Sequence, residues 1–251
     1  MEVHQHLHTP RQKWKHYFYE FFMLFLAVTL GFFVENQREH YIEHNRAKQF
    51  AQALLSDLIS DTATLASNIK MLKEIILSQE KMLALMRRHD STQVPGATLY
   101  YYASKAEAGT FFTVKTTTLQ QLKNSGSLRY FKSFDLVKLI NEYDQALTNQ
   151  FGRGDVDMAY GAEYRQAYRE LFSFIEDDKL NHLLFLYPES RDSLLRLDIP
   201  LLTTDKKQLS YFMHALDNRR YNLSRRVEKY YSEPLDAAIQ LINALKKEYH
   251  F

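Results

Sequence analysis

The chain has 251 residues and a formal net charge of +2, enough for one substantial domain plus a membrane segment. The balanced charge argues against a nucleic-acid binder, because neutralising phosphates requires a concentrated basic surface. The lack of cysteine excludes disulfides, thiolate metal ligands and cysteine nucleophiles. Seven glycines and five prolines leave little room for a turn-rich β fold, so the composition indicates a mostly α-helical protein.

Residues 1–16 form a short polar tail in which His4, His6 and His8 alternate with other residues. A His-x-His-x-His run can bind a transition metal. A disordered tail with incidental histidines is the simpler interpretation, and it is the one we adopt.

Residues 17–34 are apolar except for Glu20. Eighteen residues give a helix of about 27 Å, close to the thickness of a bilayer core. Trp14, Tyr17 and Tyr19 suit the membrane interface on the N-terminal side. A buried core helix is one alternative, and a cleaved signal peptide is another. No small-x-small site follows the apolar run, so we predict an uncleaved, membrane-spanning signal anchor.

The basic residues beside this segment bear on its orientation. Arg11, Lys13 and Lys15 precede it, and Arg38, Arg46 and Lys48 follow it. The first three lie closer to the span, whereas Glu35, Glu39 and Glu43 reduce the net positive charge beside the other three. We therefore predict a bacterial inner-membrane protein with a cytoplasmic tail (residues 1–16), a transmembrane helix (17–34) and a periplasmic helical domain (35–251).

A long helix is expected to continue from the span, because no proline or glycine occurs between residues 32 and 94. Its apolar positions alternate at spacings of three and four, which is typical of a heptad seam. The expected seam comprises Ala51, Leu55, Leu58, Thr62, Leu65, Ile69, Leu72, Ile76, Gln79, Leu83 and Met86. Further apolar residues widen this face, which favours a multi-helix bundle over a two-stranded coiled coil.

The rest of the chain predicts further helices and a small tip. Residues 98–118 read as a loop or a short strand pair. Helices are expected within residues 118–126, over 134–151 after the capping residue Ser133, and over 155–186. A last helix, capped by one of residues 203–205, extends to about residue 249 and is kinked or restarted near Pro234. It is long enough to return antiparallel along the first helix, giving an elongated antiparallel bundle.

Three features together resemble an uncharacterised family of bacterial single-pass membrane proteins found in Bacteroidota. They are the N-terminal span with an acidic residue near its start, its continuation through residues 34–36 into a charged helix, and a Leu-x-x-Ser-Gly-x-Leu segment. That segment is formed here by Leu122, Ser125, Gly126 and Leu128. The pair Tyr143-Asp144 departs from the aromatic pair of the family. The likeness covers most of the chain, and it implies no reaction, ligand or catalytic residue.

Two patterns suggest chemistry near the span. His40, Glu43 and His44 match the H-x-x-E-H pattern of inverted zincins, with both histidines on one helix face. Such a site needs a third ligand and a closed pocket, so solvated side chains near the membrane are the alternative we prefer. Glu20 can serve ion coupling inside a membrane, or it can extend toward the interface.

A basic cluster on the last helix is the remaining candidate, as an interaction surface or as a solvated face paired with Asp57, Asp61 and Glu74 of the first helix. It comprises Arg219, Arg220, Arg225 and Arg226. The sequence contains no phosphate-binding loop, dinucleotide fingerprint or nucleophile elbow.

We therefore predict a membrane-anchored interaction or scaffold protein of the bacterial envelope, without catalysis or a cofactor. Its expected partners are membrane lipid and either further copies of itself or another envelope protein. A sensor that signals through a partner is one alternative. A transport or motor subunit that uses Glu20 is another.

Overall fold

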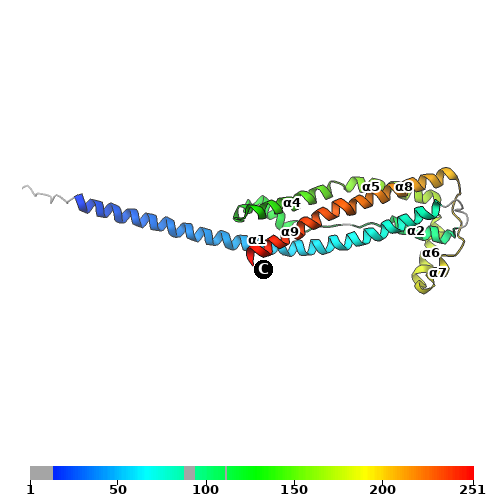
Figure 1. The fold of residues 1–251 in the computed structure, drawn as a ribbon, viewed down its shortest axis with the longest axis horizontal. Helices are drawn as coiled ribbons and strands as arrows, with labels where there is room; N and C mark the ends of the chain where they lie inside the picture. The colour runs from blue at the N-terminus through cyan, green and yellow to red at the C-terminus, as the bar shows by residue number, and fades with distance from the viewer. Residues whose placement is uncertain (1–13, 88–93, 111) are drawn as a thin grey trace, which may run out of the picture.

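The computed structural model describes residues 14–87, 94–110 and 112–251, and all regular secondary structure in them is helical. The predicted mostly α architecture is therefore confirmed. A single long helix runs through the molecule, and the other helices pack along its C-terminal half to form an elongated antiparallel bundle (Figure 1).

Helix α1 (Trp14–Met86) is uninterrupted over 73 residues. After Gly31 the next glycine or proline is Pro95, so every intervening residue can keep its helical hydrogen bonds. The prediction that the apolar segment continues into a bundle helix is thus confirmed. In Figure 1 the N-terminal part of α1 stands alone, while the remainder lies against the other helices.

The last third of the bundle returns along α1. Helix α8 (Lys206–Arg225) starts at Asp205, whose carboxylate accepts hydrogen bonds from the backbone N–H groups of Lys207 and Gln208. A π-helical turn, η4 (Arg226–Tyr231), joins α8 to α9 (Ser232–Tyr249), in which Pro234 occupies the first turn. The predicted antiparallel return is confirmed, because the C-terminus lies beside the middle of α1 (Figure 1).

Between these long elements, α3 (Thr117–Asn124), η2 (Ser127–Tyr130) and α4 (Phe134–Phe151) cover the part of the bundle near the free end of α1. Gly126 takes a left-handed conformation, with φ of 66°, where α3 gives way to η2. The Ser133 hydroxyl accepts a hydrogen bond from the Leu136 N–H and begins α4 at the predicted residue.

The expected loop or strand pair over residues 98–118 is wrong in its first half, where α2 (Gly96–Glu107) forms. Six of its residues are buried at helical spacing, so the packed face overrides the β propensity of the tyrosines. Gly96 is required where this helix begins, since any Cβ there would collide with the backbone of Ile199. Residues 108–110 and 112–116 are irregular.

The helix expected over residues 155–186 is divided into α5 (Gly154–Leu171) and α6 (Phe174–Leu186). Phe172 is extended, and the Ser173 hydroxyl accepts from the Glu176 N–H to begin α6. The freed Leu171 carbonyl accepts from the Leu202 N–H at 3.0 Å. The short elements η3 (Pro188–Ser190) and α7 (Arg191–Leu194) follow at the far end.

Two apolar clusters lie in series along α1. The proximal core, nearer the free end of α1, joins α1 to α3, α4 and α9. The distal core joins the end of α1 to α2, α5 and α8, and aromatic rings such as Tyr164, Phe172 and Phe212 fill it. Because both cores share α1, this helix connects the whole bundle to the free segment.

Candidate functional site

The free N-terminal part of α1 carries the most distinctive surface of the molecule, and we term residues 14–34 the base and residues 35–46 the stalk. The window that suits a membrane span has none of its side chains buried. Trp14, Phe21 and Phe32 are among the most exposed large apolar residues there. A contiguous apolar surface of this size on a protein marks a contact with membrane or partner. Within the described residues, α1 is the one helix that is long and apolar enough to cross a membrane.

Glu20 lies on the base, where the Nε2 atom of His16 approaches its carboxylate at 3.7 Å. Both side chains are more than half exposed. The pair is separated by one helical turn, so it forms locally on α1 without help from the bundle. This geometry places an acid at the N-terminal edge of the apolar surface.

The two histidines of the H-x-x-E-H pattern contact different residues. His40 contacts Glu43 at 3.8 Å on the exposed stalk, whereas the His44 ring lies 6.3 Å from that of Tyr249. The described residues contain no group of three His, Cys, Asp or Glu side chains suited to hold a metal ion. His4, His6 and His8 lie outside the described residues.

The predicted basic cluster on the last helix is divided among separate environments. Arg219 is buried, and it donates hydrogen bonds to the carbonyl oxygens of Ala106, Glu107 and Ala108 at 2.6–3.1 Å. It therefore holds the end of α2 and is unavailable as an interaction surface, which corrects the prediction for this residue. Burial lowers its pKa, since desolvation penalises the charged guanidinium.

The other three arginines also have individual neighbours. Arg220 pairs with Asp217 at 2.8 Å and approaches Glu80 of α1 at 3.9 Å. Arg226 lies 3.4 Å from Asp157 of α5, and Arg225 lies over the Tyr221 ring. The residues of α1 proposed as their partners, Asp57 and Asp61, bind elsewhere.

Asp61 occupies the centre of the buried seam of α1. Its carboxylate accepts hydrogen bonds from the Tyr143 hydroxyl at 2.9 Å and from the Lys115 backbone N–H at 3.1 Å. One turn earlier, the Asp57 carboxylate accepts from the Thr118 hydroxyl at 2.6 Å. Together they tie the irregular segment, α3 and α4 to α1.

Burial shifts the pKa of Asp61. Desolvation raises the pKa of Asp61 above its ordinary value of 3.8, and the two hydrogen bonds to the carboxylate oppose the change. Burial also raises the pKa of the Tyr143 phenol, and the neighbouring Asp61 charge adds to this effect. Tyr143 thus remains a hydrogen-bond donor. Because its oxygens already accept hydrogen bonds from the protein, the Asp61 carboxylate has a structural role and is not available as a general base.

The expected seam captured only half of the buried positions. Seven residues of the expected seam are buried as predicted, namely Ala51, Leu55, Leu58, Leu65, Leu72, Gln79 and Leu83, whereas Thr62, Ile69, Ile76 and Met86 are only partly buried. Leu54, Ile75 and Met82, which were expected to widen the apolar face, are buried as well, together with the polar residues Asp61 and Asn68. Asp61 and Asn68 were missed because the expected seam passed through their neighbours Thr62 and Ile69 instead. A strict three-four spacing traced from Ala47 without regard to polarity finds them.

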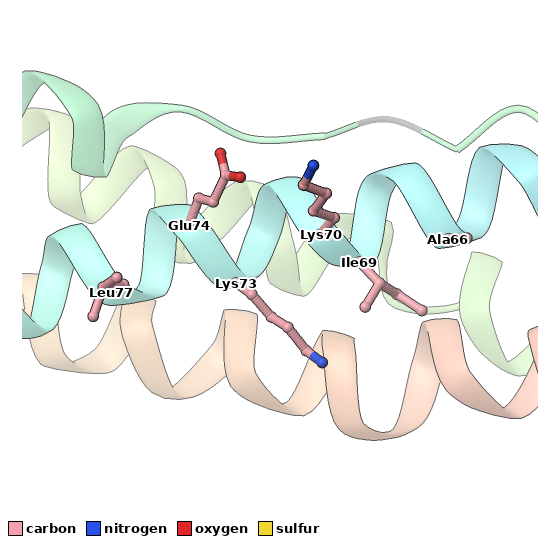
Figure 2. Close-up of a pocket in the computed structure, with 6 residues that line it drawn as sticks. All are labelled: Ala66, Ile69, Lys70, Lys73, Glu74 and Leu77. Carbon is pink, nitrogen blue, oxygen red and sulfur yellow. The ribbon is translucent and has the colours of Figure 1, made fainter.

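On its outer side α1 borders an open groove of about 380 Å³, lined by Ile69, Lys73, Leu77 and their neighbours (Figure 2). Figure 2 shows Lys70 and Glu74 on one side of the helix and Lys73 on the other. The polar groups diverge, whereas a small-molecule site needs them to converge. This groove is therefore a surface feature of α1.

Comparison with known protein families, with curated proteins and with solved structures finds no match for this chain.

Proposed function

We propose that this protein is a membrane-anchored interaction or scaffold protein of the bacterial envelope, with no catalysis of its own. The observation that carries the proposal is the contrast within α1, which exposes an apolar base and buries the seam of its remainder. Residues 17–34 cross the inner membrane, and the bundle lies in the periplasm. The resemblance to single-pass proteins of Bacteroidota supports this placement.

The orientation follows from the basic residues closest to the span, Arg11, Lys13 and Lys15, which stay in the cytoplasm. Residues 35–46 then form a stalk of about 18 Å, and the bundle begins at Ala47, its first buried residue. The stalk and bundle together form a rod of about 80 Å along α1. Such a rod presents surfaces at a fixed distance from the membrane.

The partner is another copy of the chain or a second envelope protein. Ile59, Met71 and Leu77 of α1 are each about half exposed on the bundle surface. Exposed apolar residues of this kind support protein contacts, although single ones are common on monomers. They are the positions at which contact should be tested.

Photo-crosslinking in cells, with the span intact, tests this function. A photoreactive residue at Leu77 should give a discrete adduct with one protein, whereas the same residue at the buried Leu58 should give none. Absence of any discrete adduct from Ile59, Met71 and Leu77 would overturn the scaffold role.

Signal reception through a partner is the second candidate function. It is supported by the distal core, which is joined to the base by the unbroken α1. A change in packing at the far end can therefore shift the same helix that meets the membrane.

A further inference from the structure

A cleft of about 590 Å³ opens at the far end of the bundle, where α5 ends and α6 begins. Tyr168 and Phe172 line it with stacked rings, whose centroids are 4.7 Å apart with an interplanar angle of 21°. Phe172 also packs against Tyr100 and Phe212 of the distal core. The aromatic floor is therefore rigid, which favours binding of an apolar group without rearrangement.

The wall of the cleft is apolar and open to solvent. Phe174 is 81% exposed, and Ile175 and Leu202 are more than half exposed. Phe174 and Ile175 form the first turn of α6, immediately after the break at Ser173. The break that divides α5 from α6 thus creates the cleft and places these side chains beside it. Covering them with an apolar ligand group removes this surface from water.

The rim of the cleft is positively charged on its α5 side. Arg165 and Arg169 are one helical turn apart, and among the described residues neither guanidinium has an ion pair or a hydrogen bond. The buried Arg219 lies next to Arg165, since a Cβ at Gly161 would be 3.0 Å from Nη1 of Arg219 and 3.2 Å from Nη1 of Arg165. Arg219 donates to backbone carbonyls and lies over the Tyr164 ring, and it forms no ion pair among the described residues, so its charge adds to the field at this corner.

Two acids from other helices also line the cleft. Glu107 comes from the end of α2, and Asp177 comes from the first turn of α6. The Tyr168 hydroxyl is shielded from solvent and lies near the Asp177 carboxylate, which also accepts a hydrogen bond from the Asn181 side chain at 3.1 Å. Two cations and two anions around an apolar floor match a ligand that carries one charge of each sign.

We propose that this cleft binds a free α-amino acid with a large apolar side chain. The ligand carboxylate contacts Arg165 and Arg169, which offer fork-shaped donors for bidentate pairing. The ammonium group lies toward Glu107 and Asp177. The side chain packs on Phe172 and against Phe174 and Ile175.

Isothermal titration calorimetry on the full chain in lipid nanodiscs tests the site, with empty nanodiscs correcting for partition of the ligand into lipid. The probes are L-phenylalanine, 3-phenylpropionate, which lacks the ammonium group, and phenethylamine, which lacks the carboxylate. L-phenylalanine should bind most tightly of the three. Failure to bind, or tighter binding of 3-phenylpropionate, overturns the proposal.

Arg169→Gln should weaken L-phenylalanine binding by about tenfold or more, as expected when a charge-assisted hydrogen bond is lost. Arg196→Gln removes an exposed arginine of the same end of the bundle that lies outside the cleft, and it should leave affinity unchanged. Glu107→Gln should reduce the preference for L-phenylalanine over 3-phenylpropionate. Equal effects of Arg169→Gln and Arg196→Gln would show that the binding lies elsewhere.

Discussion

The two parts of α1 follow opposite rules of burial. From residue 16 to residue 42 every side chain is exposed, including a run of phenylalanines and leucines. From Ala47 onward the helix buries one face, and that face includes the polar residues Asp61 and Gln79. A continuous helix therefore serves two environments. Its exposed apolar residues mark the part that is long and apolar enough to cross a membrane, and its buried polar residues mark the part that organises the bundle.

The largest expected effect comes from removing a buried leucine of the bundle part. Leu58 is fully buried, so Leu58→Ala should lower the free energy of unfolding by about 2–5 kcal/mol. Urea unfolding in detergent micelles, followed by circular dichroism, measures this loss. The control Leu24→Ala, at a position 69% exposed on the base, should change it by less than about 0.5 kcal/mol. Similar losses in both variants would contradict the division of α1.

The next largest effect concerns the hydrogen bond that the Tyr143 hydroxyl of α4 donates to Asp61. Tyr143→Phe removes a hydrogen bond to a buried carboxylate and should cost about 1.5–3 kcal/mol in the same unfolding measurement. Tyr41→Phe removes an equivalent hydroxyl from the exposed stalk and serves as the control. If Tyr143→Phe left the free energy of unfolding unchanged, the hydrogen bond from α4 to Asp61 would not stabilise the fold.

A smaller effect appears in the pH dependence of stability. Because burial raises the pKa of Asp61, the folded protein keeps this proton at pH values at which the unfolded chain has released it. The contribution of Asp61 to stability is therefore greatest at low pH, and it falls as pH rises from the ordinary pKa of 3.8 toward the raised one. The unfolding free energy of the native chain minus that of Asp61→Asn should decrease over this range. A difference that increases with pH would contradict the raised pKa of Asp61.

The smallest effect belongs to the stalk. Arg38 pairs with Glu35 at 2.8 Å, and both side chains are exposed. Arg38→Ala should change the unfolding free energy by no more than about 0.5 kcal/mol, because water screens such pairs. A larger loss would mean that the stalk is packed against a partner.

The sequence predicted the parts of the fold that depend on local signals. The lack of glycine and proline after Gly31 predicts the unbroken α1, and the capping residues Ser133 and Asp205 begin α4 and α8 as expected. The division of α5 from α6 also had a local signal, since Ser173 and Glu176 have the spacing of a capping box. That signal lies inside a strongly helical stretch and was overlooked.

The remaining features depend on tertiary contacts that periodicity does not show. The burial of Asp61 requires Tyr143 from a helix 82 residues away to satisfy it. Arg219 was assigned to the surface because an arginine is rarely buried, yet three carbonyls at the end of α2 accept its donors. The distal cleft arises where α2, α5 and α6 meet, and the sequence alone does not place these elements together.

The most direct test of the account asks whether the base of α1 lies within a membrane. Because the chain has no cysteine, single cysteines can be introduced at Leu26 in the base and at the exposed Gln52 in the bundle. A membrane-impermeant maleimide reagent is then applied to spheroplasts of cells producing each variant. We expect rapid labelling at position 52 and none at position 26 until detergent is added. Equal labelling at both positions in intact spheroplasts would contradict a membrane-spanning base.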